Sequence, residues 1–434
     1  MRFLLTFVLM ILSLGFCYGG NDKMFLKDGI KKIQLKNGIT LIYKYTEPLP
    51  IVSVNIFIKL GSINEPKDKL GLTNLTQILL TKGTKKRTSN QIAIEIESMG
   101  GDLGASASED YSNVSLTITK KYFSKAMELL SDVFLNPTFP EEELQKELVV
   151  VDASIRSRQD HIFNVSYDLL RKNLYGEHPY AELSIGTTET IKNIKRDDIV
   201  NWHEKYYGLE NIIFVVVGNV SCNEVKNAIE KYFSDIPKGE IPEEKIPLVQ
   251  PSKKSVVEKK KFEQAYLMFG FITPEMSDED YTKLKVLNTY LGSGMNSVLF
   301  QELREKEGLG YEVHSFYPSR KDKSHFVIYI GLDKSSVEKA KDKILKILEE
   351  IKSQPVQDEK LKEAKTYLTG TYLLDHQTVS KQAWYLGWWE ITGRGYEYDQ
   401  KYITDIEEIK SSDLQEVAKK YFSDNYVMVE ILPE

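Results

Sequence analysis

The stretch from Ile191 to Val217 reads IKNIKRDDIVNWHEKYYGLENIIFVVV, and the stretch from Ile406 to Ile431 reads IEEIKSSDLQEVAKKYFSDNYVMVEI. Each contains Ile-x-x-Ile, then an Asp and a Tyr at the same two spacings, and each closes with a largely apolar run. The matched positions are Ile194, Asp198 and Tyr206 in the first stretch and Ile409, Asp413 and Tyr421 in the second. This shared register indicates an internal duplication of about 200 residues.

The rest of the chain predicts strands and helices that do not alternate strictly. Apolar patterning predicts a hairpin around Asn37-Gly38 and strands at 52–58, 103–108, 114–118 and 212–217. Helices are expected at 74–83, near 92–95, at 122–135 and over about 140–175. We therefore expect an α+β fold with largely antiparallel sheets.

A linker is expected between the two halves. Four prolines lie in or beside the charged stretch 238–254, which is a linker composition. They are Pro237, Pro242, Pro247 and Pro251. The expected division is an N-terminal domain over 21–235, a linker over 236–255 and a C-terminal domain over 256–434.

Residues 1–20 have the pattern of a signal peptide. Arg2 precedes an apolar run from Phe3 to Phe16, and small residues follow at Gly19-Gly20. An uncleaved N-terminal anchor is the alternative, although the run is short for a bilayer span. Phe16 is larger than lipoprotein processing normally accepts, so no lipid anchor is expected at Cys17. We expect an exported, periplasmic chain with no membrane span in its mature part.

Composition excludes several classes of function. The net charge of −6, with Lys and Arg scattered among Asp and Glu, gives no basic face and argues against a nucleic-acid partner. With Cys17 in the leader, Cys222 is alone, so neither a disulfide framework nor a cysteine metal site is expected. The six histidines lie at least 11 residues apart and form no His-x-x-His or His-x-x-x-His pair. No alternative metal site follows from them.

Residues 71–84 read GLTNLTQILLTKGT on an expected helix. Positions 74, 77 and 78 share one helical face and could together hold a metal ion. They are occupied by Asn74, Gln77 and Ile78. Zinc is bound by imidazole, thiolate or carboxylate groups, so two neutral amides and an aliphatic side chain provide neither a site nor a base.

This stretch resembles the M16 metallopeptidases, the pitrilysin, insulinase and processing-peptidase group, whose His-x-x-Glu-His motif runs on into Lys-Gly-Thr. Counting back from Lys82-Gly83-Thr84, the resemblance places Asn74, Gln77 and Ile78 at the two ligands and the general base. The family's remaining ligand, a glutamate on a second helix, corresponds to Ser154. Neither Asp152, about 200° round the helix, nor Glu147, on the order of 10 Å along it, replaces that ligand. The resemblance therefore implies a member without zinc and without a hydrolytic centre.

Residues 290–311 read YLGSGMNSVLFQELREKEGLGY, which predicts a glycine turn, a helix and a strand. From the residues alone, Arg304 is a solvated helix residue and Tyr311 shares a strand face with Leu309 and Val313. The resemblance implies a different role. In the family this segment supplies an arginine and a tyrosine that face the zinc across a clamshell and hold the substrate peptide. Some two-subunit bacterial members divide the zinc motif and the Arg/Tyr pair between two chains, and this sequence is similar to the second kind.

Two further stretches leave alternatives open. Residues 100–108 correspond to the family's edge strand beside the zinc, where a substrate would add as a strand, or are an ordinary edge strand. The aromatic residues Trp384, Tyr385, Trp388 and Trp389 recur at i and i+4, which fits either core or inter-half packing or a partner interface.

The resemblance implies two homologous α/β-sandwich halves in a clamshell, the LuxS/M16-like metallopeptidase fold. The leading hypothesis is a non-catalytic, substrate-binding subunit of a heterodimeric exported zinc peptidase. In it, Arg304 and Tyr311 bind peptides, and zinc is expected only in a homologous partner with an intact His-x-x-Glu-His. A structural or scaffold pseudopeptidase without peptide turnover is the alternative. An active hydrolase using unrecognised residues is the third hypothesis.

Overall fold

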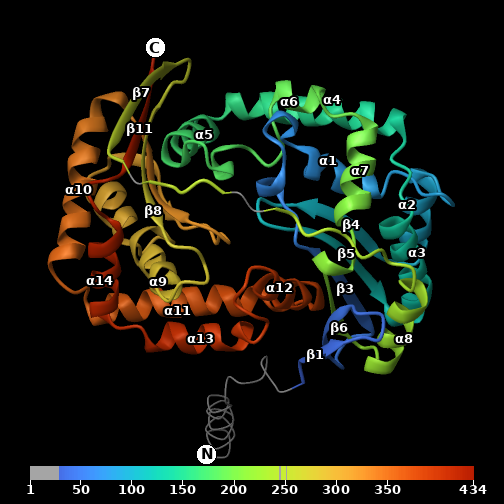
Figure 1. Ribbon diagram of the computed structural model, residues 1–434. Coiled ribbons are helices and arrows are strands. Elements are labelled where there is room, and N and C mark those ends of the chain that lie inside the picture. Colours follow the sequence, from blue (N-terminus) through green and yellow to red (C-terminus); the bar gives the residue numbers. More distant parts are fainter. Residues whose placement is uncertain (1–28, 244–245, 251) are drawn as a thin grey trace, which may run out of the picture.

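The computed structural model describes residues 29–243, 246–250 and 252–434. The predicted signal peptide, including Cys17, lies outside the described residues. Two sheets, each backed by helices, stand on either side of the molecule, with the first half blue to green and the second yellow to red (Figure 1). Within the described residues, no helix is both long and apolar enough to cross a bilayer.

The first half is built on a six-stranded sheet in the order β1-β2-β6-β3-β5-β4. Its strands are β1 (Lys31–Gln34), β2 (Thr40–Tyr45), β3 (Ile51–Ile58), β4 (Asp102–Ala107), β5 (Ser112–Thr119) and β6 (Ile212–Gly218). Its helices are α1 (Leu72–Leu80), α2 (Ser89–Ser98), α3 (Phe123–Leu135), α4 (Glu141–Ser157), α5 (Ile162–Tyr175), α6 (Thr188–Lys192), α7 (Arg196–Tyr206) and α8 (Cys222–Tyr232).

The second half is built on a five-stranded sheet in the order β7-β11-β8-β10-β9. Its strands are β7 (Lys254–Lys260), β8 (Ala265–Thr273), β9 (Gly310–Phe316), β10 (Ser324–Leu332) and β11 (Val427–Pro433). Its helices are α9 (Tyr281–Gly292), a π-helix (Phe300–Glu305), α10 (Val337–Ser353), α11 (Asp358–Asp375), α12 (Val379–Ile391), α13 (Tyr398–Glu408) and α14 (Ser411–Tyr421).

The two sheets have the same topology. The order β2-β6-β3-β5-β4 in the first half matches β7-β11-β8-β10-β9 in the second. In each, the first pair is parallel and the following pairs are antiparallel. The repeated sequence stretches form α7 with β6 and α14 with β11. The predicted duplication and the α+β fold of two homologous halves are thereby confirmed.

Each half also gives one helix to the other half's sheet. The stretch predicted as helix over about 140–175 is in fact broken at residues 158–161, so that α4 stays with the first half while α5 leaves it. Leu170 and other apolar residues of α5 pack against β8 and β11. In return, Leu386 of α12 packs with Phe57 and Val215 of the first sheet. The two exchanged helices therefore lie between the sheets (Figure 1).

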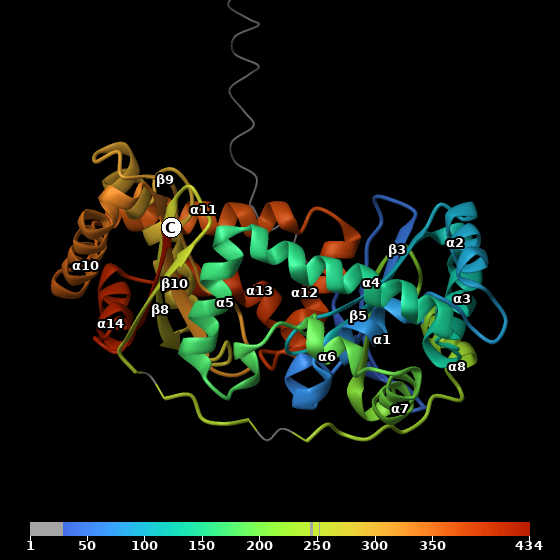
Figure 2. The same cartoon turned by 90° about the horizontal axis from the view of Figure 1, so that it is seen from above.

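The tryptophans of α12 belong to this packing. Trp384 and Trp388 stack with ring centroids 5.4 Å apart and pack against the first half's sheet, whereas Trp389 is buried in the second half's core. The packing alternative for the aromatic run is thus confirmed. The described parts of the segment between α8 and β7 lie along one side of the molecule (Figure 2).

Buried polar groups add to the contact between the halves. Arg320 forms an ion pair with Glu109 at 2.6 Å, and the ring of His325 lies between the hydroxyls of Tyr167 and Tyr175, at 2.7 Å and 2.8 Å. Burial, with the nearby arginine charges, holds the pKa of His325 well below its ordinary value. A neutral imidazole can donate to one tyrosine oxygen and accept from the other, which satisfies this buried site.

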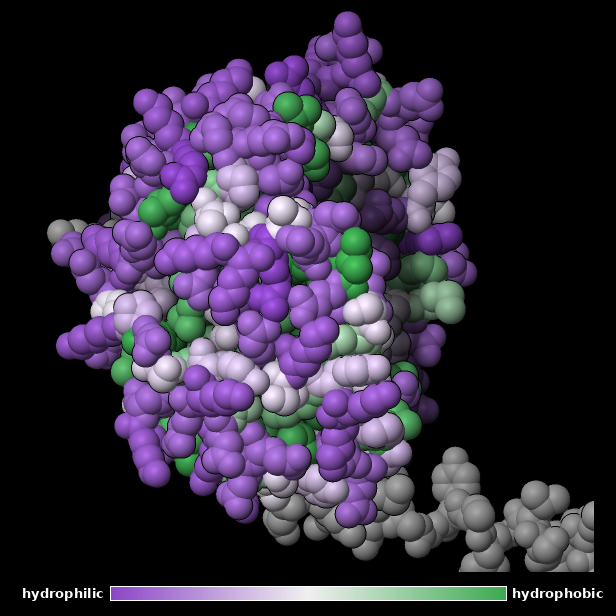
Figure 3. Space-filling model, turned by 90° about the vertical axis from the view of Figure 1, so that its right-hand side faces the viewer, coloured by the Kyte–Doolittle hydropathy of each residue, from purple (hydrophilic) through white to green (hydrophobic). Residues whose placement is uncertain are grey.

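The outer helical face of the first half is mainly hydrophilic, with hydrophobic atoms scattered among polar ones (Figure 3). Its helices turn their apolar faces inward, as Leu129, Leu130 and Val133 of α3 illustrate by being fully buried. This face shows the ordinary surface of a helical layer and does not indicate a binding surface.

Candidate functional site

Helix α1 carries three of the four positions that the zinc motif would need. Gln77 is fully buried and its Nε2 donates to the hydroxyl of Tyr207 at 2.8 Å, while Asn74 and Ile78 are partly buried. The Glu65 carboxylate caps the helix by accepting from the backbone N–H groups of Gly71 and Thr73, at 2.7 Å and 2.6 Å. Burial raises the pKa of Glu65 to about 7, although these hydrogen bonds oppose the shift. The helix is therefore a packed structural element.

Helix α4 lies beside α1 and carries the fourth position. Ser154 is exposed, and its hydroxyl donates to the carbonyl of Val150 at 2.9 Å. The two neighbouring carboxylates are already paired, Glu147 with Lys82 at 2.7 Å and Asp152 with Arg156 at 2.8 Å.

The donor set at α1 and α4 does not fit zinc. It consists of two amides, a hydroxyl and an aliphatic side chain, with no imidazole, thiolate or free carboxylate. Across the residues that the structure describes, no group of three or more His, Cys, Asp or Glu side chains is placed to hold a metal ion. No reaction step through a metal can be derived for this chain.

Arg304 lies on a π-helix, Phe300–Glu305, in which Lys306 donates its N–H to the carbonyl of Gln301 at 3.0 Å. Such wide turns are rare and occur frequently at functional sites. The turn that follows the helix contains Gly308, whose φ of +62° is in the left-handed region that favours glycine. Arg304 is exposed there, with its guanidinium carbon 4.9 Å from the ring centroid of Phe300.

Tyr311 lies at a β-bulge on the edge strand β9. The register with β10 pairs Gly331 with Glu312 and Leu332 with Gly310, which leaves Tyr311 without a partner residue. A bulge re-aims side chains, and Tyr311 is 70 % exposed whereas Val313 is buried. The expectation from strand alternation, that Tyr311 shares a face with Leu309 and Val313, is therefore wrong. Its physical reason is the extra residue, which no feature of the residue pattern alone revealed.

The structure brings the two residues together. The Nη1 of Arg304 donates to the backbone carbonyl of Tyr311 at 2.9 Å. Within the described residues, Arg304 pairs with no carboxylate, and the Tyr311 hydroxyl has no hydrogen-bond partner. A guanidinium has five N–H donors, so most remain free for a ligand. The exposed Arg304 is thus held against the backbone of Tyr311, whose side chain is also exposed.

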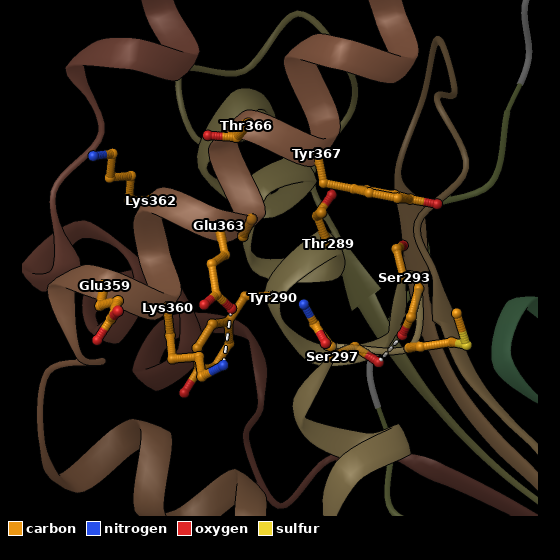
Figure 4. Close-up of a pocket in the computed structure, with 14 residues that line it drawn as sticks. Thr289, Tyr290, Ser293, Ser297, Glu359, Lys360, Lys362, Glu363, Thr366 and Tyr367 are labelled. Atoms are coloured by element: carbon orange, nitrogen blue, oxygen red, sulfur yellow. Dashed lines mark hydrogen bonds and ion pairs between the residues drawn. The ribbon is translucent and has the colours of Figure 1, made fainter.

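A pocket of about 640 Å³ is lined in part by residues 289–297, which directly precede the π-helix in the sequence. One wall is the end of α9 with the turn 293–297, which leads into the π-helix, and the other is α11 (Figure 4). Lys360 and Glu363 form an ion pair at 2.8 Å on the α11 side, and Ser297 lies on the turn. The lining is mixed: the α11 side carries charged side chains, and hydroxyl groups and the apolar Met295 complete the wall.

Strand β4 forms the edge of the first sheet, as the sequence predicts for residues 100–108. It lies beside α1, and its side chains from Gly104 to Ala107 are small. The edge is thus accessible to another strand.

Comparisons with known proteins agree with this architecture. The description "Insulinase (Peptidase family M16)" matches residues 40–188, and "Peptidase M16 inactive domain" matches residues 193–368. An uncharacterized zinc protease YmxG of Bacillus subtilis is 27 % identical over 93 % of this chain and 98 % of its own length. A non-peptidase homolog YmxG of Helicobacter pylori is 24 % identical over 88 % of this chain and 89 % of its own length.

Solved structures show the same fold. A peptidase M16 inactive domain from Pseudomonas fluorescens superposes with a TM-score of 0.88 at 22 % identity, covering 94 % of this chain and 98 % of that one. A protease from Helicobacter pylori gives 0.86 at 24 % identity, covering 94 % and 100 %. The two family matches show that the chain belongs to the peptidase M16 family, as a homologue of the inactive type.

Proposed function

We propose that this protein is the non-catalytic, peptide-binding subunit of a heterodimeric, exported M16 zinc peptidase. The observation that carries the proposal is the contrast between the two sites of the chain. The α1 site has no zinc donors. Arg304 and Tyr311, in contrast, are linked by a hydrogen bond and exposed, and within the described residues neither the guanidinium pairs with a carboxylate nor the phenol with any group. The zinc would be supplied by a homologous partner with an intact His-x-x-Glu-His.

The chemistry of the pair suits a peptide. The remaining N–H groups of Arg304 can donate to a backbone carbonyl or to a carboxylate in a forked arrangement, and the Tyr311 phenol adds one donor and an apolar ring. Arg304 is held by Phe300 and by the Tyr311 carbonyl, so less side-chain entropy is lost when a ligand binds. These residues would position the peptide and would not carry out the hydrolysis.

The test is peptide cleavage by this chain, by its zinc-bearing partner and by the reconstituted pair. We expect cleavage only by the pair, with zinc in the partner. Arg304→Ala should lower kcat/KM of the pair by about 10²-fold, the cost of losing charge-assisted hydrogen bonds to the substrate. Tyr311→Phe should lower it less, because only the hydroxyl is lost.

Lys306→Ala is the matched control, since Lys306 is an exposed cation two residues after Arg304 that pairs with Glu302. It should leave cleavage unchanged. Size-exclusion chromatography of each variant pair shows whether assembly persists. Unchanged cleavage by the Arg304→Ala pair would refute the peptide-binding role. An assembled pair with a zinc-loaded partner and no cleavage would favour the scaffold alternative.

A further inference from the structure

A second pocket, which shares no lining residue with the pocket of Figure 4, lies where α9, α11 and α12 meet. These helices lie close together at the base of the second half (Figure 1). The pocket has a volume of about 560 Å³. Its aromatic lining consists of Tyr281, Tyr372, Tyr385, Trp388, Trp389 and Tyr402. One amine, that of Lys285 on α9, also lines it.

Lys285 has no counter-ion among the described residues. Its Nζ donates to the carbonyl of Tyr317 at 2.7 Å and lies 5.3 Å and 5.0 Å from the ring centroids of Tyr281 and Tyr317. Burial lowers the pKa of Lys285 to about 7. A sheltered ammonium without a carboxylate is costly, and an anionic ligand would offset that cost.

The other charges near the pocket are already satisfied. The Asp375 carboxylate on α11 accepts from the Tyr385 hydroxyl at 2.6 Å and pairs with Lys381 at 3.3 Å. The hydrogen bond from Tyr385 is the main cause of its lowered pKa, so Asp375 stays ionised and paired. Asp399, behind the Tyr372 wall, accepts from the Tyr372 hydroxyl at 2.7 Å and lies 2.9 Å from the Nε2 of His376. Asp375, which lines the pocket, is therefore engaged by other groups and does not act as the counter-ion of Lys285.

We propose that this pocket binds a small aromatic carboxylate, with its carboxylate group on Lys285 and its ring against Tyr385 and Trp388. A primary ammonium has three N–H donors, and the Tyr317 carbonyl takes one, which leaves two for the carboxylate oxygens. The aromatic walls favour a flat ring through stacking and edge contacts. A free arylalkanoic acid and the C-terminal aromatic residue of a peptide both have this chemistry. The proposal does not depend on the proposed function.

Isothermal titration calorimetry of the full chain tests the ligand class. We expect 3-phenylpropionate or N-acetyl-L-phenylalanine to bind at least tenfold more tightly than acetate and N-acetyl-L-phenylalaninamide. Binding of 3-phenylpropionate alone assigns the site to free acids, and binding of the N-acetyl acid assigns it to peptide ends. Equal binding of the acid and its amide would overturn the proposal, because the carboxylate would then contribute nothing.

Variants test the residue. Lys285→Met keeps the apolar stem and should lose at least tenfold in affinity. Lys283→Met, two residues away on the same helix, removes a lysine that is paired with Asp280 at 2.8 Å and should bind as the unaltered chain does. Equal losses in both variants would refute the assignment of Lys285.

The pH dependence on the unaltered chain needs no variant. Only the protonated amine pairs with a carboxylate, so affinity should fall up to tenfold per pH unit above about 7 and should level off between about pH 6 and pH 5, where the ligand carboxylate is still ionised. An affinity that is constant from pH 6 to pH 9 would overturn the proposal even if Lys285→Met failed to fold.

Discussion

Replacing Gly387 by alanine tests the exchange of helices between the two halves. Gly387 on α12 faces Phe57 of β3, and a Cβ built there would lie 2.0 Å from the Phe57 ring. Phe57 is fully buried on a central strand, so relief requires that the ring or the whole helix move by more than 1 Å, against a normal contact of about 3.5 Å. Overpacking of this kind costs up to about 3 kcal/mol, and alanine's better helix propensity returns about 1. We expect a net loss of about 2 kcal/mol.

Gly370→Ala is the matched control. Gly370 lies on α11 of the same half, and nothing is within 4 Å of a Cβ built there. That variant should gain about 0.5–1 kcal/mol from helix propensity. Urea denaturation followed by circular dichroism compares the two variants with the unaltered chain.

A double variant tests whether the cost arises at this contact. Phe57→Leu should destabilise the unaltered chain by about 1 kcal/mol but should be neutral or stabilising when combined with Gly387→Ala. Two outcomes would refute the reasoning. One is a Gly387→Ala variant as stable as Gly370→Ala, and the other is strict additivity of the Phe57 and Gly387 changes.

Three further predictions follow from the described contacts. Arg320→Met leaves the buried Glu109 with only the more distant Arg171, at 3.9 Å, and should cost about 3 kcal/mol at pH 7. Burial alone would raise the pKa of Glu109, but Arg320 and Arg171 hold it below its usual value, so this stabilisation is lost as pH falls below about 4.5 and the two chains should converge there. Glu65 has a pKa raised to about 7, so its contribution to the free energy of unfolding is present at pH 4.5 and is lost as pH rises through 7. In unfolding curves measured over this pH range, Glu65→Gln should reduce the loss of stability between pH 4.5 and pH 7 by up to about 3 kcal/mol. Asn74→His combined with Ile78→His places two imidazoles one helical turn apart on α1, and zinc at 100 times its Kd should stabilise that variant by about 2.7 kcal/mol in thermal unfolding while leaving the unaltered chain unaffected.

Each has an outcome that contradicts it. A constant difference between the Arg320→Met variant and the unaltered chain from pH 7 to pH 3.5 would show that the ion pair is not its cause. A Glu65→Gln curve parallel to that of the unaltered chain would exclude Glu65 as the titrating group. Equal zinc stabilisation of the Asn74→His single variant would show that the two positions do not act together.

The sequence predicts the chemistry that is missing from α1. Zinc requires particular donor atoms, and donor atoms are a property of residue type. The four positions that the family resemblance assigns to the zinc site, Asn74, Gln77, Ile78 and Ser154, therefore lack zinc donors before any coordinates are known. The strands and most of the helices follow from periodicity for a similar reason, because burial of one face imposes a local pattern. The sequence gives only a weak indication of the Lys285 pocket, namely a lysine between Leu284 and Val286 in an apolar stretch of the helix.

Only the tertiary structure shows that Arg304 and Tyr311 are both exposed and in contact. Their sequence allows a solvated helix residue and an inward-facing strand residue, and only the π-helix and the bulge opposite Gly331 and Leu332 make them neighbours in solvent. The bulge depends on how two strands pair, and the π-helix depends on a hydrogen bond five residues apart within one helix; neither leaves a periodic trace in the sequence.

The sequence by itself determined the duplicated α+β architecture and the absence of zinc donors, because these depend on local patterns and on the chemistry of single side chains. The tertiary structure alone decided that α5 and α12 change halves. The break at residues 158–161 would allow α5 to pack on either sheet. Which sheet each helix covers is decided by contacts between residues far apart in the chain, such as Leu170 of α5 against Gly270 and Gly387 of α12 against Phe57. Long-range complementarity of this kind has no local signature, since each apolar face is satisfied by any buried partner of suitable shape.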